Sequence, residues 1–137
     1  MSKNKKKIAM VLTEGSFDKA MMPFLLGVTA SASGIEAHIF FTFWGINVIK
    51  KGAKPKLPGM WKPFTGIMIK KMKKKNIATL DELLEQAREL GVKLYACSAT
   101  MELMSIKKED LIDGVEVIGA AGFLKIAAES DIQLFIG

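Results

Sequence analysis

The sequence predicts an α/β protein, a three-layer α/β/α sandwich in which a mainly parallel sheet of about five strands is covered by helices on both faces. Strand-like and helix-like segments alternate along the whole chain, and in such chains successive strands run parallel with a helix crossing between them. The 137 residues fit a single domain, residues 1–137, and show neither an internal repeat nor a second domain.

The first half of the chain predicts two strands and the helix between them. An apolar strand at residues 8–13 is followed by apolar residues at helical spacing over residues 17–32. Pro23 lies inside this helix and predicts a kink or a late start, because proline lacks a backbone donor. Residues 36–43 are β-branched and aromatic and apolar on both faces, which predicts a central parallel strand that runs into a short helix.

The second half continues the alternation after a change of composition. Residues 51–66 are rich in glycine and proline and predict a binding loop or lid, followed by a short amphipathic helix. Thr79 and Glu82 form a capping box that opens the next helix, which ends near Gly91. The remaining predicted elements are strands at residues 92–96, 115–118 and 132–136, a short helix through residue 104 and a helix at residues 119–129.

The cysteine count and the apolar runs predict where the protein is found. Cys97 is the only cysteine, so no internal disulfide forms, which predicts a reducing, cytoplasmic location. The longest apolar stretch, residues 35–49, is shorter than the roughly 20 residues of a membrane span. We therefore expect no membrane span. The lysine-rich start (Lys3, Lys5, Lys6 and Lys7) indicates a solvated tail that leads into the first strand.

Positive charge is concentrated in one part of the chain. The net charge is +6, and one dense block contains Lys70, Lys71, Lys73, Lys74 and Lys75. Such a block can contact nucleic acid, anionic lipid or an acidic partner, or it can be a solvated helix end. No aromatic residues interleave with these lysines and arginine is nearly absent, so we expect no nucleic-acid partner.

Cys97 is the main candidate for chemistry. It falls at or just beyond the carboxyl end of the third predicted strand, the rim where open α/β sheets bind ligands. The first turn of a helix favours a thiolate. Glu102 in the same turn and a wall formed by Met101 and Met104 oppose ionisation. Position alone leaves two hypotheses open, a reactive thiol and an inert buried residue.

Other polar residues have competing interpretations. Thr42, Trp44 and Asn47 follow the second strand and either line the same rim as Cys97 or are a core tryptophan with a capping threonine. Ser98 and Thr100 are typical helix caps. His38 lies in a buried strand, which favours a structural role. One cysteine and one histidine without spaced acidic partners predict no metal site, and no motif for an organic cofactor is present.

Several blocks of the sequence resemble the DsrE/DsrF-like proteins, and in particular the second DsrE subfamily, often labelled peroxiredoxin-like. The resemblance spans nearly the whole chain in order. It is carried by residues 91–97 (GVKLYAC), 101–104 (MELM), 40–45 (FFTFWG), 113–117 (DGVEV) and 134–136 (LFI).

The resemblance implies a three-layer α/β/α fold, homo-oligomers, and a cysteine that carries sulfane sulfur between sulfurtransferases and small sulfur-carrier proteins. Only Cys97 is carried over as the catalytic residue. The family has Gln, Met and Ser where this chain has Ser98, Ala99 and Thr100, and Gly where it has Ser105. The second cysteine of some members is absent, so a persulfide cannot be released by forming an internal disulfide.

We therefore expect a sulfur carrier or sulfurtransferase that receives sulfur on Cys97 from a small sulfane-sulfur donor and hands it to an acceptor thiol. The residues expected to line the site are Ser98, Ala99, Thr100, Thr42, Trp44 and Asn47. The alternative is a non-catalytic homo-oligomeric binding or assembly module with an inert Cys97. A peroxide-reducing thiol enzyme ranks last, because the chain lacks a resolving cysteine and an activating arginine motif. The apolar Met60, Trp61 and Phe64 of the long loop are expected at a contact between copies.

Overall fold

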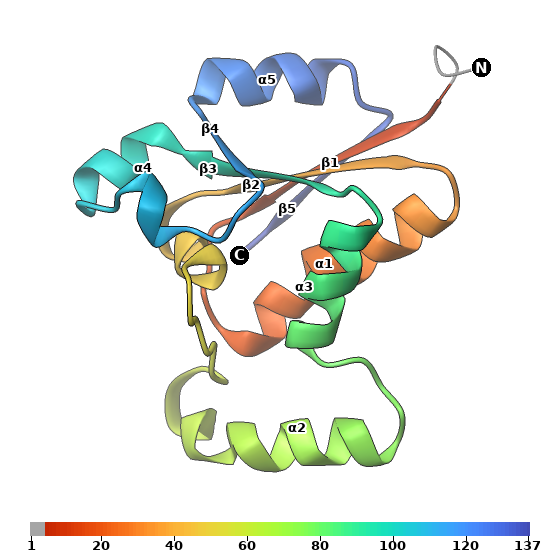
Figure 1. The fold of residues 1–137 in the computed structure, drawn as a ribbon, viewed down its shortest axis with the longest axis vertical. Coiled ribbons are helices and arrows are strands. Elements are labelled where there is room, and N and C mark those ends of the chain that lie inside the picture. The colour runs from red at the N-terminus through yellow and green to blue at the C-terminus, as the bar shows by residue number, and fades with distance from the viewer. Residues whose placement is uncertain (1–4) are drawn as a thin grey trace.

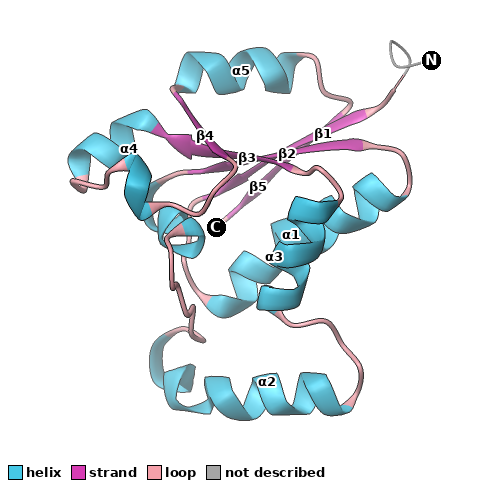
Figure 2. Cartoon of the chain, viewed as in Figure 1, coloured by secondary structure: helices cyan, strands magenta, loops and turns pink. Residues whose placement is uncertain are grey.

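The computed structural model describes residues 5–137, so the tail residue Lys3 lies outside the described residues. Along the chain, strands alternate with helices (Figures 1 and 2). The strands are β1 (Lys7–Leu12), β2 (Glu36–Phe41), β3 (Lys93–Cys97), β4 (Val115–Ile118) and β5 (Ile132–Ile136). The α-helices are α1 (Phe17–Ala32), α2 (Thr65–Lys74), α3 (Leu80–Glu89), α4 (Ser98–Leu103) and α5 (Ala120–Ala128). Three 3-10 helices, η2 (Phe43–Ile49), η3 (Gly59–Phe64) and η4 (Lys108–Asp110), lie in the connections.

The five strands form one sheet in the order β4-β3-β2-β1-β5. Every neighbouring pair is parallel, which confirms the predicted fold class. All strands therefore end at the same edge of the sheet, and the residues that follow β2 and β3 lie side by side there. None of the helices in the described part of the chain is long and apolar enough to cross a membrane.

Helices cover both faces of the sheet. In Figure 1, α1 and α3 lie on one face and α5 on the other. Successive side chains of a strand point to opposite faces, and β2 shows this with two neighbouring aromatic residues. Phe41 packs against Phe24 of α1 with ring centroids 5.7 Å apart, and Phe40 stacks on Phe123 of α5 at 4.7 Å. This apolar packing on both faces explains why β2 lacks the alternation of a half-exposed strand.

The start of α3 follows its predicted signal, and the start of α1 does not. At the start of α3, Glu82 Oε1 accepts hydrogen bonds from the backbone N–H of Thr79 at 3.1 Å and from its hydroxyl at 3.0 Å, which confirms the capping box. The expected late start of the first helix is wrong, because α1 begins at Phe17 and runs through Pro23. Phe17, Pro23 and Phe24 are all buried, so packing on both sides of the proline holds this turn in place.

The second strand ends two residues earlier than expected, and the reason is a close contact with β1. Phe43 has a positive φ of 49°, a backbone conformation that cannot continue a strand. The next turn folds back over β1, where a Cβ on Gly45 would collide with the carbonyl oxygen of Leu12. Glycine at this position therefore lets η2 lie directly on the end of β1, which fixes Thr42 at the carboxyl edge of the sheet.

Candidate functional site

Cys97 is the last residue of β3 and the N-cap of α4. Its backbone is still extended (φ −71°, ψ 116°), and the next residue begins the helix. The side chain is 7% exposed. The prediction that Cys97 lies at the carboxyl rim of the sheet is confirmed, and the thiol lies just below the surface rather than on it.

Two threonine hydroxyls meet beside Cys97. Thr42 follows β2 and Thr100 lies in the first turn of α4, and their Oγ1 atoms are 3.1 Å apart. The backbone N–H of Phe43 donates to Thr100 Oγ1, also at 3.1 Å. Thr100 is 3% exposed. Its hydroxyl is used in this contact and Cys97 is the N-cap of α4, so the capping interpretation of Thr100 is wrong. Thr42 does occupy the N-cap position of η2, but its side chain makes no capping bond there.

These groups set the charge of the cysteine. Burial raises the pKa of the Cys97 thiol, and this is the largest single effect. Hydrogen bonds from the backbone N–H and hydroxyl of Thr100, the hydroxyl of Thr42 and the backbone N–H of Ala99 lower it. Together they outweigh burial, so the pKa of Cys97 is lowered from its ordinary value. Hydrogen bonds to the charged form favour that form, and the thiolate is the reactive nucleophile.

The hydroxyl groups of Thr42 and Thr100 can reorient when the Cys97 sulfur ionises. Thr42 and Thr100 carry one hydroxyl proton each, and the N–H of Phe43 already occupies one acceptor site of Thr100. With a neutral thiol, one hydroxyl can donate to the other. With a thiolate, both can turn toward the sulfur. The threonine pair can therefore respond to ionisation without any movement of the backbone.

The features expected to oppose ionisation have unequal effects. Met101 is buried and Met104 half-buried, which supplies the expected apolar wall. Glu102 is exposed, and the lowering of the Cys97 pKa is caused by hydrogen bonds that outweigh the opposing effect of burial. The exposed position of this carboxylate lets water screen its charge, so it opposes ionisation less than the buried apolar wall does.

Two exposed aromatic residues border this group. Phe43 is 52% and Trp44 58% exposed, so the interpretation of Trp44 as a core residue is wrong. Bulky residues rarely adopt a positive φ, and such strained positions are concentrated at functional sites. Phe43 is therefore a candidate site residue that the sequence alone did not indicate. Its motif FFTFWG marks the segment, but nothing in the motif indicates the backbone conformation.

The remaining expected residues lie at different places around the rim. Ser98 and Ala99 are exposed. Ser98 faces the turn between β4 and α5, where a Cβ on Gly119 would lie 3.5 Å from its Oγ. Asn47 is half-buried, and its Cβ lies beside Gly15 of the loop between β1 and α1. The structure thus gathers Thr42, Thr100 and Ala99 around Cys97 and places Ser98 and Asn47 on either side.

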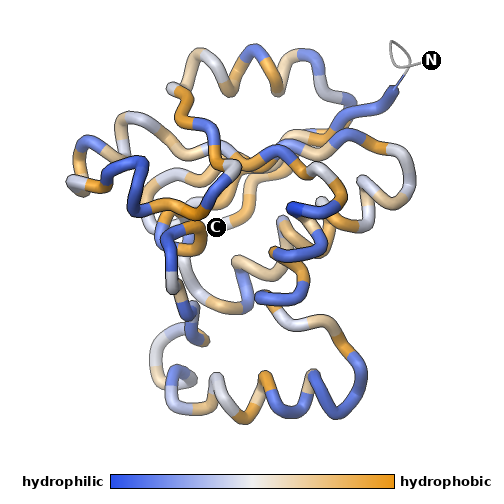
Figure 3. The backbone as a smooth tube through the Cα atoms, viewed as in Figure 1, coloured by the Kyte–Doolittle hydropathy of each residue, from blue (hydrophilic) through white to orange (hydrophobic). Residues whose placement is uncertain are grey.

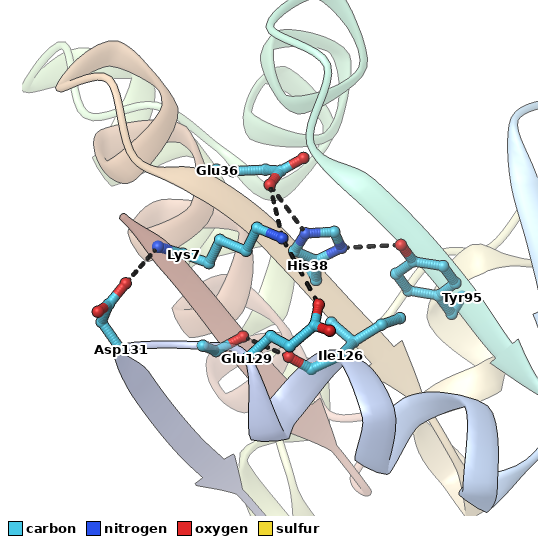
Figure 4. A network of polar contacts seen from close by, with 8 residues as sticks. Lys7, Glu36, His38, Tyr95, Ile126, Glu129 and Asp131 are labelled. Atoms are coloured by element: carbon cyan, nitrogen blue, oxygen red, sulfur yellow. Dashed lines mark hydrogen bonds and ion pairs between the residues drawn. The ribbon is translucent and has the colours of Figure 1, made fainter. Parts of the chain in front are cut away.

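His38 lies in a separate polar network, away from the carboxyl edge (Figure 4). It is 7% exposed, as expected for a buried strand residue. Its Nδ1 is 2.8 Å from the hydroxyl oxygen of Tyr95, and its Nε2 lies 3.6 Å from the Glu36 carboxylate. Burial lowers the pKa of His38, and Glu36 opposes this only in part. No cluster of three or more metal-ligating side chains occurs in residues 5–137.

The fold and this site define a class of protein: a parallel α/β protein with a lone, hydrogen-bonded cysteine where a central strand becomes a helix. The family model of the DsrE/DsrF/DrsH-like family matches residues 4–62 and 56–135. The chain belongs to this family, as the sequence motifs predicted.

Two relatives agree with this assignment, and a solved structure shares the fold. The chain is 40% identical over 158 aligned residues to the sulfur carrier protein DsrE2 of Allochromatium vinosum, covering 96% of this chain and 98% of that protein. It is 37% identical to the protein YrkE of Bacillus subtilis, covering 99% and 100%. The crystal structure of the ychN protein from E. coli shares the fold with a TM-score of 0.64 at 18% identity, over 96% of this chain and 98% of that one.

Proposed function

We propose that the protein is a sulfur carrier that holds sulfane sulfur as a persulfide on Cys97 and passes it to an acceptor thiol. The observation that carries this proposal is a buried cysteine at the junction of β3 and α4, beside the paired hydroxyls of Thr42 and Thr100 and with a lowered pKa. The 40% identity to a sulfur carrier protein supports the same chemistry.

The proposed reaction needs no cofactor and no net oxidant. The Cys97 thiolate attacks the outer sulfur of a donor persulfide, a new S–S bond forms, the donor S–S bond breaks, and the donor leaves as a thiolate. In the second step an acceptor thiolate attacks the terminal sulfur of the Cys97 persulfide, and the Cys97 thiolate leaves. Because a thiol of lower pKa leaves faster in such exchanges, the same donors assist release as well as uptake.

The rim residues receive distinct proposed roles. Thr42, Thr100 and the N–H of Ala99 hold the charged sulfur, and Ser98 lies at the outer side of the same junction. Trp44 and Asn47 lie three residues apart in η2, a spacing that places them on one side of a 3-10 helix. With Phe43 they form a rim against which the acceptor would pack, because exposed aromatic residues are typical anchors of interfaces.

The partners of this proposal are a small sulfane-sulfur donor and a small sulfur-carrier protein or sulfurtransferase. A homo-oligomer and a cytoplasmic location belong to the same proposal. Light scattering of the purified protein at micromolar concentration tests the oligomer, and a monomer would contradict it.

The competing function is a binding or assembly module in which Cys97 is inert. The 7% exposure of Cys97 favours this alternative, because a buried free cysteine commonly acts as a small apolar residue. The two functions differ in whether the folded protein reacts at Cys97.

Sulfur loading separates them. Reduced native protein is treated with polysulfide, and its intact mass is measured before and after dithiothreitol. We expect the mass of one added sulfur atom, lost on reduction and absent in Cys97→Ser. Labelling of Cys97 only after unfolding would contradict the carrier function and support the assembly module.

A further inference from the structure

The segment formed by η3 and α2, residues 59–74, is here called the arm. In Figure 1 it lies apart from the sheet, beyond α1 and α3. The arm exposes large apolar side chains that the body of the protein does not cover. They are Met60 (79% exposed), Trp61 (58%), Phe64 (49%), Ile67 (63%) and Met68 (42%). Chains that act alone seldom leave so many large apolar side chains of one segment in water, which indicates that this surface binds a partner.

The apolar residues are arranged along one side of the arm. The rings of Trp61 and Phe64 lie 5.9 Å apart. Phe64 is the N-cap of α2, and its spacing to Ile67 and Met68 places the three on one face of the helix. Thr65 and Met72 are the buried residues of α2. Ile67 lies on the opposite side of the helix from both, whereas Met68 lies one turn from Met72 on the same side. The exposed apolar stripe therefore runs from the outer side of the arm to its flank.

The charge around this stripe has a single sign. Between Glu36 and Asp81 the sequence contains no acidic residue. The same stretch contains ten of the chain's 20 basic residues, namely Lys50, Lys51, Lys54, Lys56, Lys62, Lys70, Lys71, Lys73, Lys74 and Lys75. Lys70, Lys71 and Lys74 follow Ile67 by three, four and seven residues, so they flank it on its own face. Within residues 5–137, no ion pair involves a lysine of the arm.

The inner side of the arm is also cationic. A cavity of about 420 Å³ between the arm and the body is lined by Lys54, Lys56, Lys62 and Lys73, with Asp81 as its one acidic residue. The arm therefore carries positive potential on both sides, and that charge is available to an outside anion.

We propose that the arm docks on the surface of an anionic membrane, independently of the sulfur chemistry proposed for Cys97. The apolar stripe enters the boundary between headgroups and acyl chains, and the lysines contact the lipid phosphates. Helices that bind in this way carry lysines around an apolar face with tryptophan or phenylalanine. Each basic residue near an anionic leaflet adds to the attraction.

The choice of basic residue separates a membrane from other anionic partners. Nucleic-acid and protein interfaces favour arginine, whose planar group forms paired hydrogen bonds, and protein interfaces are depleted in lysine. The only arginine of the chain, Arg88, lies in α3 outside the arm. In Figure 3 the first part of α2 is mainly apolar, and a hydrophilic run follows toward the end of the helix. A second copy of this chain would place lysines against lysines, so it is the less favourable occupant.

The test uses the full-length protein and two kinds of vesicle, phosphatidylcholine alone and phosphatidylcholine with phosphatidylserine. We expect co-sedimentation with the anionic vesicles only, weakened by salt. Replacing Lys70, Lys71 and Lys74 with Gln should weaken it on the order of a hundredfold, and Trp61→Ala by roughly tenfold. The matched control replaces Lys107, Lys108 and Lys125 with Gln, three exposed lysines outside the arm, and should bind as the parent does.

A second readout tests insertion directly and does not depend on an arm variant. In a Trp44→Phe protein, Trp61 is the only tryptophan, and its emission should shift to the blue with anionic vesicles. Absence of binding to anionic vesicles would overturn the proposal, as would equal losses in the arm and control variants. An oligomer that Trp61→Ala dissociates, in a parent that binds no vesicles, would assign the arm to a second copy. Sulfur loading of Cys97 in the parent protein is a separate measurement, so none of these outcomes decides the proposed carrier function.

Discussion

Cys97 and His38 lie toward opposite ends of the same sheet and are equally buried. The surroundings of Cys97 favour its charged form, whereas those of His38 favour its neutral form. Burial disfavours the charged form of both groups. At Cys97, four donors from Thr42, Ala99 and Thr100 outweigh burial and favour the thiolate. At His38, one carboxylate 3.6 Å from Nε2 compensates only in part, so the imidazole is held neutral.

The difference shows what a buried site needs in order to stay charged. The carboxyl edge of the sheet offers unpaired backbone N–H groups at the start of α4 and two hydroxyls that can reorient. The amino half of β2 offers His38 a tyrosine hydroxyl and a single carboxylate, and His38 Nε2 is buried without a hydrogen-bond partner among the described residues. Burial alone therefore does not decide reactivity; the number of donors aimed at the group does.

The largest effect is expected from removing the threonine donors. Thr100→Val keeps Cys97 buried but removes the hydroxyl that donates to the sulfur. The same change leaves the backbone N–H of Phe43 without its acceptor. The pKa of Cys97 should rise, and the thiolate fraction at neutral pH falls about tenfold for each unit of that rise. The unpaired N–H should also cost about 1–3 kcal/mol of unfolding free energy.

The pH dependence of Cys97 alkylation by iodoacetamide in the folded protein measures the first effect, and urea denaturation the second. Thr100→Ser keeps the hydroxyl and is the matched control, with a midpoint close to that of the parent. A Thr100→Val protein with the same midpoint as the parent would show that the hydroxyl does not set the charge of the sulfur.

An intermediate effect is expected at the other end of the sheet. The pKa of His38 is lowered in the folded protein from its ordinary value of 6.5. In the pH range between these two pKa values, the unfolded chain therefore binds more protons than the folded protein does. The contribution of His38 to stability is therefore present above the unfolded pKa and is lost as the pH falls through this window.

His38→Gln keeps a side chain that can pair with Tyr95 but cannot titrate, so its unfolding free energy should depend less on pH between neutral and about pH 5. Urea denaturation across this range measures it. Alkylation of Cys97 should stay within about twofold of the parent, since distant sites act independently. A large change in Cys97 reactivity would show that the two ends of the sheet are coupled.

The smallest effect is expected at the strained rim. Phe43→Gly relieves the positive φ at a residue whose side chain is half exposed, and should raise the unfolding free energy by about 0.5–1 kcal/mol. Phe43→Ala removes the ring but keeps the unfavourable conformation, so it should gain nothing. Thermal denaturation of both proteins compares them, and equal stabilities would mean that the backbone of Phe43 stores no strain.

Local signals predicted most of the fold. The runs at residues 115–118 and 132–136 give strands with the same bounds in the structure, because β-branched and aromatic residues end abruptly at turn residues there. The capping box at Thr79 specifies the start of α3 through bonds three residues apart. The alternation of elements was enough to predict the parallel sheet.

Long-range contacts account for what the sequence did not predict. The second strand stops at Phe41 because Gly45 packs on the carbonyl of Leu12, 33 positions away in sequence. The topology brings Thr42 and Thr100 to one edge, but the direction of their hydroxyls depends on packing that no local motif encodes. The exposure of Trp44 and the pairing of His38 with Tyr95 are likewise properties of the folded chain.

The pH at which folded protein takes up sulfur on Cys97 tests the proposed carrier function most directly. Native protein is exposed briefly to polysulfide across a pH series, and the fraction of protein carrying one added sulfur is measured by intact mass. We expect uptake without unfolding, with a midpoint below that of an unperturbed cysteine and no uptake in Cys97→Ser. Uptake that appears only with denaturant, or a midpoint above that of an unperturbed cysteine, would contradict the carrier function.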